Sequence, residues 1–592
     1  LSKHLWNVIL WMSQYYLTPL GQVAKSVLPA SLSLKYKPPI KWMVEICDSF
    51  TEENLLSIPV RAKAQATIAE ILYHSKKRTL ITTLNEYVSN PLDICRKLKS
   101  KGFVRMSEIV SPPDVTGFTF DPVQKKIKFN KEQAETIDKI SKAISNNIYQ
   151  PFLLHGVTGS GKTEIYIEAA RNAIQSGKTV IILLPEISLT PQIAGRFRSV
   201  FGEEVALWHS KLTPAQRAWT WKEICSDTFK VVIGARSAIF SPLKKVGLIV
   251  IDEEQESSFK QEAPAPRYHA RDVALVRGRY EKSAVVLASA TPSLESYYNQ
   301  ILGKLDLLHL SKRFGGAKYP QTHIVDMIKD QEESGKYGLI LSGLLQDKIE
   351  DRLGKGEQVI LLQNRRGYSP VMRCGDCGEV VSCRHCNVSL TFHRNKKKLI
   401  CHYCGYSPDG ISESCNSCHS PNMKFFGTGT QRVESILEET FPKAKIKRLD
   451  LDTTKSGAKI TAILQSFEKG EIDILIGTQM IAKGLDFSNA TLVGIINADV
   501  GLHLPDFRAG ERIFQLIYQA SGRAGRRSKL GEVVIQTYNS ENPVIKKAAK
   551  LDLKAYYNII MSERKELNYP PFSWIAKVVF TGQNQQSVEN SS

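Results

Sequence analysis

Short apolar segments alternate with helical stretches twice along this 592-residue chain, and this alternation limits the possible fold more than any other feature. The first block covers residues 122–312 and contains FLLHG, TVIILLP, KVVIGA, VGLIVID and AVVLASA. The second covers residues 338–545 and contains QVILLQN, KIKRLDLD, DILIGTQ, TLVGIIN and EVVIQTY. Strands separated by helices in this way predict a parallel sheet covered by helices. We therefore expect an α/β protein with two parallel-sheet lobes.

The remaining segments predict smaller units around the two lobes. Residues 1–56 carry amphipathic runs interrupted by prolines, which are typical of a linker or of the remnant of another domain. Residues 57–112 read as short helices that end in a basic helix and a strand, and they resemble a winged helix, with a helical spacer as the alternative. Residues 372–424 interrupt the second block as an insertion. Residues 546–592 are expected to begin a further domain that is cut short.

The charge balance favours a polyanionic partner. The chain has 79 Lys and Arg residues against 59 Asp and Glu residues, a formal net charge of +20. Such an excess favours phosphate neutralisation, so nucleic acid is the first candidate and general solubility is the alternative. The chain contains no run of about eighteen apolar residues, so we expect no membrane span.

A phosphate-binding loop is predicted directly after the strand FLLH. The segment GVTGSGKT has the pattern G-x-x-x-x-G-K-[ST] and precedes a helical stretch. Backbone N–H groups of such a loop point at phosphate oxygens, the lysine reaches the β and γ phosphates, and the hydroxyl after it binds Mg²⁺. The predicted nucleotide-binding residues are Gly156, Val157, Thr158, Gly159, Ser160, Gly161, Lys162 and Thr163.

Two acids follow the buried strand LIVI. Asp252 and Glu253 stand where a strand delivers side chains to the carboxyl edge of a sheet, the edge at which ligands of α/β folds bind. Asp252 is the predicted Mg²⁺ ligand, and Glu253 is predicted to orient or deprotonate the attacking water. A helix cap or a solvated turn is the alternative for an acidic strand end taken alone.

Two further segments have polar patterns suited to phosphate chemistry. SATPS, residues 289–293, follows a strand and offers hydroxyls that could sense the phosphate or link the acids to a DNA track; a simple strand-end turn is the alternative.

QASGRAGR, residues 519–526, places Arg523 and Arg526 three apart, on one face if the segment is helical. Both are predicted to act as arginine fingers on the γ phosphate, with a basic helix end as the alternative.

Eight of the eleven cysteines fall in the insertion as four C-x-x-C pairs. They are Cys374, Cys377, Cys383, Cys386, Cys401, Cys404, Cys415 and Cys418. Four such knuckles can saturate two Cys₄ zinc sites with no position left for water, so two structural Zn²⁺ ions are predicted, with an iron–sulfur cluster as the alternative. Spacing allows three pairings of the knuckles. No signal peptide is recognisable, so metal binding in a reducing cytoplasm fits better than disulfides.

The stretch FKQEAPAPRYHARD after the acidic strand predicts contacts with single-stranded DNA. Phe259 and Tyr268 offer faces for base stacking, and Arg267 and Arg271 offer phosphate contacts. A plain surface loop is the alternative.

Six segments of the chain resemble, in their order, the motifs of superfamily 2 helicases. They are GVTGSGKT, DEEQ, SATP, NRRG (364–367), GTQMIAKGLDF (477–487) and QASGRAGR. The cysteine array, RYHARD (267–272) and GARSAIFSP (234–242) narrow the resemblance to the bacterial primosomal, replication-restart helicases, over residues 5–575. The resemblance implies RecA-like lobes, ATP-dependent 3′-to-5′ DNA unwinding at stalled or branched forks, and initiation of primosome assembly.

The resemblance also implies partners and further site residues. Gln133 and Gln519 would join the nucleotide site, and the nested zinc pairing would place Cys374, Cys377, Cys415 and Cys418 around one ion. Expected partners are single-stranded and forked DNA, primosome proteins and single-stranded-DNA-binding protein. We expect a cytoplasmic, nucleoid-associated monomer.

The sequence departs from the family pattern at three places. Gln255 stands where the family usually has His, so we expect altered coupling, and Pro264 and Pro266 lie near the position of its usual Trp. The family's N-terminal DNA-binding domain and longer C-terminal domain are expected to be absent or cut short. One alternative function is an ATP-switched zinc scaffold that binds DNA and recruits replication proteins without productive unwinding. An RNA helicase is another, which the zinc array disfavours.

Overall fold

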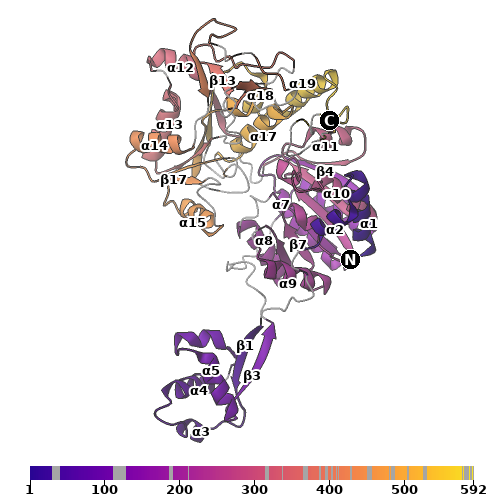
Figure 1. The fold of residues 1–592 in the computed structure, drawn as a ribbon, viewed down its shortest axis with the longest axis vertical. Coiled ribbons are helices and arrows are strands. Elements are labelled where there is room, and N and C mark those ends of the chain that lie inside the picture. Colours follow the sequence, from indigo (N-terminus) through magenta and orange to yellow (C-terminus); the bar gives the residue numbers. More distant parts are fainter. Residues whose placement is uncertain are drawn as a thin grey trace.

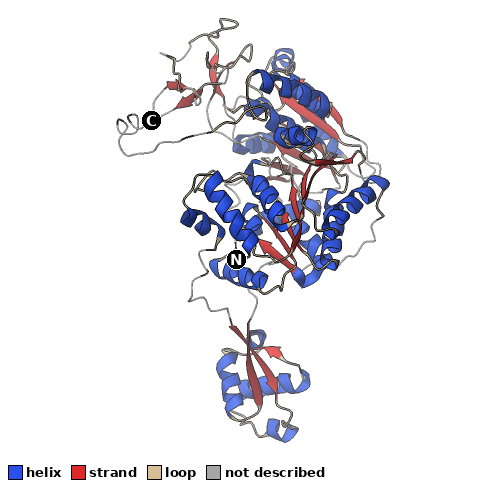
Figure 2. Ribbon diagram, turned by 90° about the vertical axis from the view of Figure 1, so that its right-hand side faces the viewer, coloured by secondary structure: helices blue, strands red, loops and turns tan. Residues whose placement is uncertain are grey.

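The structure is a computed structural model, and Figures 1 and 2 show its ribbon from two directions. It describes residues 1–592 except for 30–31, 33–39, 76, 111–127, 186–190, 211, 314–318, 337, 364–370, 386–388, 394–397, 402–404, 409, 411–412, 427–429, 450–456, 479–480, 482–486, 488, 503–505, 525–529, 577, 579–585, 587–589 and 591–592. None of the helices within these described residues is long and apolar enough to cross a bilayer.

Lobe 1 is built on a seven-stranded sheet in which all neighbours are parallel, in the order β10-β4-β9-β8-β5-β7-β6. Its strands are β4 (Gln150–Gly156), β5 (Thr179–Leu183), β6 (Val205–Trp208), β7 (Val231–Gly234), β8 (Val246–Asp252), β9 (Ala284–Ser289) and β10 (Asp306–Leu310). The five predicted strands are confirmed. The short strands β6 and β10 lie at the two edges and were not predicted.

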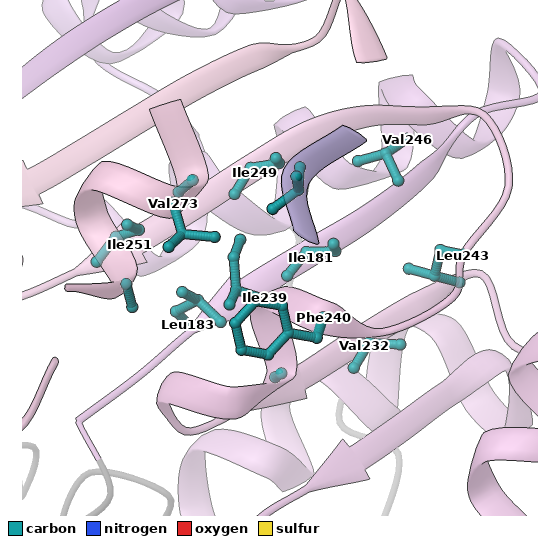
Figure 3. Packing of buried hydrophobic residues seen from close by; sticks show 14 of the residues in the cluster. Ile181, Leu183, Val232, Ile239, Phe240, Leu243, Val246, Ile249, Ile251 and Val273 are labelled. Atoms are coloured by element: carbon teal, nitrogen blue, oxygen red, sulfur yellow. The ribbon is translucent and has the colours of Figure 1, made fainter. Parts of the chain in front are cut away.

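Both faces of this sheet are buried, which explains why its strands read as continuous apolar runs. Successive side chains of a strand point to opposite faces, so Ile249 and Ile251 enter one core cluster while Leu248 and Val250 enter another. Figure 3 shows the first of these clusters at close range. The covering helices are α6 (Lys131–Ser145), α7 (Lys162–Gln175), α8 (Pro191–Phe201), α9 (Pro214–Cys225), α10 (Ala270–Glu281) and α11 (Leu294–Ile301).

The N-terminal helices pack against lobe 1, which differs from the predicted linker over residues 1–56. α1 (Lys3–Tyr15) and α2 (Leu20–Val27) bury Leu5, Met12 and Val23 in the same cluster as Ile249. The Tyr16 hydroxyl also accepts a hydrogen bond from the His269 backbone N–H at 3.1 Å. The apolar faces of these amphipathic helices therefore pack against lobe 1, which lies far along the chain.

A smaller unit lies apart from the lobes at one end of the molecule (Figure 1). Its antiparallel sheet has the order β2-β1-β3, with β1 (Ile40–Ile46), β2 (Thr79–Leu80) and β3 (Val104–Val110). The helices α3 (Glu52–Leu56), α4 (Lys63–Ser75) and α5 (Pro91–Ser100) accompany the 3₁₀ turn η1 (Ile81–Glu86). Because β1 pairs along its whole length with β3, this unit begins before the predicted boundary at residue 57. Its assignment as a winged helix stays a prediction.

Lobe 2 carries a six-stranded parallel sheet in the order β11-β20-β19-β12-β18-β17. The strands are β11 (Gln321–Asp326), β12 (Gln358–Leu362), β17 (Ile446–Leu449), β18 (Ile474–Gly477), β19 (Ala490–Ile495) and β20 (Glu532–Thr537). The helices are α12 (Met327–Ser334), α13 (Gly343–Gly354), α14 (Thr430–Thr440), α15 (Gly457–Glu468), α16 (Asp499–Leu502), α17 (Ala509–Ser521), α18 (Pro543–Ala549) and α19 (Leu553–Glu566). The two-lobe α/β prediction is confirmed.

The edges of lobe 2 differ from the predicted boundaries at both ends. β11 precedes residue 338 yet pairs with β20, so the sheet begins earlier in the chain than predicted. α19 was placed in a further domain, but its residues Leu553, Tyr556 and Tyr557 are buried in the lobe 2 core.

The insertion in lobe 2 forms a four-stranded antiparallel sheet in the order β15-β14-β13-β16. Its strands are β13 (Val371–Cys374), β14 (Thr391–His393), β15 (Lys398–Ile400) and β16 (Met423–Phe426). The first and last strands pair with each other, with Val371 opposite Phe426. The insertion therefore leaves lobe 2 and returns to it at neighbouring points.

Candidate functional site

The phosphate loop occupies the carboxyl end of β4, as predicted. β4 ends at Gly156 and α7 begins at Lys162, with Gly159 and Gly161 at φ values of +76° and +84° that favour glycine. The Lys162 Nζ donates a hydrogen bond to the Gly156 carbonyl at 2.8 Å. A Cβ on Gly161 would lie 2.6 Å from the Gln133 Nε2, so a side chain there would collide with its neighbour.

Gln133 lies against this loop, where the family resemblance places it. Its Nε2 donates to the Ser160 carbonyl at 2.9 Å, and its side chain and backbone form a capping box with Asn130 at the start of α6. Gln133 is thus fixed on one side by its own helix and on the other by the phosphate loop.

The three predicted lobe 1 motifs meet at one edge of the sheet because β4, β9 and β8 are neighbours. His155, before the loop, stands opposite Ser289 of β9, and Asp252 of β8 stands opposite Ala288. The Tyr166 hydroxyl of α7 donates to the Asp252 Oδ1 at 2.9 Å. Burial, with the Glu253 charge beside it, raises the pKa of Asp252 to about 6.

Glu253 is held in an unusual backbone conformation. Its φ is +51°, a region that few residues other than glycine adopt. Such conformations cost of order 1–3 kcal/mol and gather at functional sites. The turn is supported by the Glu253 backbone N–H, which donates to the Asp252 Oδ1 at 3.1 Å.

Two glutamine amides converge on the carboxylate of Glu253, one from each lobe. The Gln255 Nε2 donates to the Glu253 Oε2 at 2.7 Å, and the Gln519 Nε2 of α17 donates to the same oxygen at 3.1 Å. Gln255, the residue that departs from the family pattern, therefore still contacts the carboxylate predicted to handle the water. Gln519 joins lobe 2 to the acids of lobe 1.

The segment after Gln519 also approaches the phosphate loop. α17 ends at Ser521, so Arg523 lies in the turn beyond the helix, which differs from a shared helical face with Arg526. A Cβ on Gly522 would lie 2.4 Å from the Thr158 Oγ1, so the absence of a side chain at Gly522 permits this approach. Arg526 is outside the described residues, as are 364–367 and most of 477–487.

Glu254 is a buried acid that the sequence analysis did not single out. Its carboxylate accepts hydrogen bonds from the Ser293 N–H at 2.7 Å, from the Ser293 and Ser296 hydroxyls at 3.1 and 2.9 Å, and from the Arg271 Nη1 at 3.1 Å. The acidic segment is therefore linked both to the SATPS segment and to RYHARD. No local periodicity marks Glu254, because its partners lie 17 to 42 residues away.

The structure differs from the sequence analysis on the predicted DNA contacts. Phe259 and Tyr268 are 1% and 2% exposed and belong to the lobe 1 core, where Tyr268 packs edge-on against Phe240 at 5.1 Å between centroids. The Arg271 guanidinium contacts Glu254, Asp272 and Ser293 within lobe 1. Arg267 alone of these four is exposed. The two aromatic residues lie in a segment that the sequence predicts to be a surface loop, but their side chains pack in the core of lobe 1.

Four cysteines of the insertion lie together. The Sγ atoms of Cys374 and Cys418 are 3.6 Å apart, those of Cys377 and Cys415 are 3.4 Å apart, and all four lie within 4.8 Å of one another. A tetrahedral Zn²⁺ with Zn–S bonds of about 2.3 Å separates its thiolates by roughly 3.8 Å, so the group fits one zinc ion. Backbone N–H groups of Asp376 and Ser417 point at the sulfurs of Cys374 and Cys415 at 3.4 Å.

The other four cysteines are only partly described. Cys383 and Cys401 are buried together in the small core of the insertion, whereas Cys386 and Cys404 are outside the described residues. Of the three pairings that the spacing allows, the observed group of four is the nested one.

Comparison with known proteins agrees with this arrangement of motifs. The DEAD/DEAH box helicase family matches residues 130–299, the helicase conserved C-terminal domain matches 413–528, and the PriA DNA helicase Cys-rich region domain matches 383–407. The replication restart protein PriA of Chlamydia pneumoniae is 38% identical over 588 residues, 98% of this chain and 78% of that protein.

The chain belongs to the PriA family of replication restart proteins.

Other PriA relatives align over different shares of their length. PriA of Rickettsia felis is 38% identical over 96% of this chain and 88% of that protein. PriA of Bacillus subtilis is 44% identical over 77% of this chain, which spans 57% of the Bacillus protein. As a PriA-family member with both helicase domains, the chain is an ATP-dependent DNA helicase of replication restart, and its cofactors are ATP with Mg²⁺ and zinc in the cysteine-rich segment.

Proposed function

We propose that ATP binds between the two lobes and that its hydrolysis drives movement along one DNA strand. Residues 156–163 and Gln133 would hold the nucleotide from lobe 1, and Gln519, Arg523 and Arg526 would face it from lobe 2. Thr163 and Asp252 supply the hydroxyl and carboxylate oxygens that Mg²⁺ prefers. The observation that carries the proposal is the contact of Gln519 with Glu253, because it joins a lobe 2 motif to the predicted base in lobe 1.

Glu253 would act as the base that takes a proton from the attacking water. Both amide donors lie on Oε2, and they fix the direction of the carboxylate. Orientation of this kind matters because a general base must lie within hydrogen-bond reach of the proton that it removes. Lys162 and the arginines would neutralise the charge that develops on the phosphate.

The finer features of the function are also proposals. We place a second zinc on Cys383, Cys386, Cys401 and Cys404, in addition to the one on Cys374, Cys377, Cys415 and Cys418. Movement would run 3′ to 5′ on stalled or branched forks in the bacterial cytoplasm, at the nucleoid, with primosome proteins and single-stranded-DNA-binding protein as partners of a monomer. The unit over residues 40–110 would be a winged helix, and Arg267 would contact DNA phosphate.

Glu253→Gln tests the proposed role of the base. Glutamine has nearly the shape of glutamate but cannot take the proton, so we expect nucleotide affinity within about threefold of the wild type and a fall in kcat of at least about 100-fold. Hydrolysis is measured with forked DNA, single-stranded DNA and RNA side by side, with strand separation followed in parallel. Glu262→Gln, at an exposed position of the same segment, is the matched control.

DNA-stimulated hydrolysis that survives in Glu253→Gln would remove Glu253 from the mechanism. Hydrolysis by the wild type without strand separation on any fork would favour the zinc scaffold over the motor, and stimulation by RNA alone would favour an RNA helicase.

A further inference from the structure

Arg313 lies in the connection between the lobes. β10 ends at Leu310 in the sheet of lobe 1, and β11 begins at Gln321 in the sheet of lobe 2, so the chain between them links the lobes, and residues 311–313 and 319–320 of this link are described. The link is anchored to lobe 1 at its start, because the Ser311 backbone N–H donates to the Glu132 Oε2 of α6 at 2.9 Å. This hydrogen bond attaches the chain two residues before Arg313 to lobe 1.

The guanidinium of Arg313 contacts both lobes at once. Its Nε donates to the Thr158 carbonyl in the phosphate loop at 3.2 Å, and its Nη2 donates to the Gly522 carbonyl of lobe 2 at 3.0 Å. The residue is 8% exposed, and its guanidinium lies 5.4 Å from the centre of the Tyr319 ring. A buried charge is costly unless hydrogen bonds compensate it, and the bonds to the two carbonyls contribute to this compensation.

The two acceptors belong to the parts of the site that must come together. Thr158 is inside the phosphate loop, and Gly522 immediately precedes Arg523. The same two residues approach each other so closely that a Cβ on Gly522 would meet the Thr158 side chain. Arginine suits this position because its planar fork presents several N–H donors in fixed directions, whereas lysine offers a single point charge.

We propose that Arg313 is a positioning residue that holds the Arg523 turn against the phosphate loop, so that the link between the lobes sets the assembly of the ATP site. The inference rests on the proposed function, since it requires hydrolysis between the lobes. Arg313 acts through two backbone carbonyls rather than through the reacting atoms. Its loss should therefore slow turnover more than it weakens nucleotide binding.

Arg313→Ala and Arg313→Lys test this in the full chain. We expect kcat for DNA-stimulated ATP hydrolysis to fall at least tenfold in Arg313→Ala and at least fivefold in Arg313→Lys, while the Kd for ATP without DNA stays within threefold of the wild type. Lys312→Ala is the matched control, because Lys312 is the exposed neighbour in the same link, and its kcat should stay within twofold. Thermal unfolding and zinc content show that each variant is folded.

The double variant Arg313→Ala with Arg523→Ala separates positioning from simple support of the phosphate loop. If Arg313 acts through the Arg523 turn, the double variant is no more than about twofold slower than Arg523→Ala alone. The inference would be overturned if the losses of kcat in the two single variants multiplied in the double variant. It would also be overturned by a normal kcat in Arg313→Lys, or by a Kd for ATP that rose by the same factor as kcat fell. A wild type without DNA-stimulated hydrolysis would instead overturn the proposed function.

Discussion

Lobe 1 and the cysteine insertion are both built on sheets, but they are held together by different means. The seven strands of lobe 1 separate two large clusters of buried apolar side chains. Among the described residues of the four-stranded insertion, the buried cluster consists of Met372, Cys383, Leu390, Leu399 and Cys401, two of which are cysteines. We expect apolar burial to be sufficient for the first sheet and the second sheet to depend on thiolate–metal bonds.

The difference shows what each unit can tolerate. In lobe 1 the free energy of folding comes from many contacts of modest size, so one substitution removes only a part of it. In the insertion we expect a few ligand bonds to supply most of the free energy of folding, so one ligand would decide whether the unit folds. Three measurements would break or sharpen this contrast.

The largest effect is expected from loss of zinc. Cys377→Ser with Cys415→Ser removes two of the four grouped ligands, and zinc binding contributes on the order of 10 kcal/mol to the folding of such units. We expect the bound zinc to fall by one ion per chain and hydrogen exchange of residues 371–426 to accelerate. The amides of β8 should stay protected, because lobe 1 has its own core.

Cys225→Ser is the control for the zinc experiment, since Cys225 is exposed in lobe 1 and outside the array. An insertion that kept its protection after loss of the grouped cysteines would show that apolar packing suffices there, and the contrast between the two sheets would fail.

A smaller effect is expected from Glu254→Ala in lobe 1. The change removes the buried carboxylate that the Arg271 guanidinium contacts and leaves Asp272 and Ser293 as its partners, and breaking a buried ion pair costs up to about 3–5 kcal/mol. The midpoint of urea unfolding of lobe 1 should fall while the zinc content stays unchanged. Glu262→Ala, at an exposed position nearby, should leave the midpoint in place, and an unchanged midpoint in Glu254→Ala would contradict the role of this pair.

A pH-dependent effect of up to about 3 kcal/mol is expected from His155. Burial, together with His309 and Lys162, lowers the pKa of His155 to about 4, whereas an unfolded histidine titrates near 6.5. The unfolded state therefore binds more protons between these values, so this part of the stability is complete above about pH 6.5 and is lost as the pH falls to 4.

His155→Gln should flatten the pH dependence of lobe 1 unfolding in that window, and the exposed His74→Gln should not. Equal slopes for His155→Gln and the wild type would show that His155 does not contribute. Zinc release from the insertion, followed over the same range, would show whether the two units respond to acid independently.

Sequence patterns predicted those features that depend on neighbours in the chain. The alternation of apolar residues identified the central strands, the GVTGSGKT segment located Lys162, and the strand ending at Asp252 located the acids. The nested group around Cys374 followed from the family resemblance, because the spacing alone left three pairings open.

The features that were missed depend on contacts between distant residues. Phe259 and Tyr268 were assigned to DNA because their segment reads as a loop, yet its side chains fill the lobe 1 core. The roles of Glu254 and Arg313 could not be predicted because their partners lie in other segments of the chain. For Arg313, one partner lies in the other lobe. The strand β1 was missed because its partner β3 lies about sixty residues further along the chain.

The pairing of β13 with β16 has a consequence for how this molecule could have been assembled. The two strands lie side by side, so the insertion begins and ends at neighbouring points of lobe 2. The rest of lobe 2 would therefore keep the same chain path whether about fifty residues or a tight hairpin joined these strands. During evolution, a zinc-binding insertion could thus be gained, lengthened or replaced at this point without a change in the fold of the two helicase lobes.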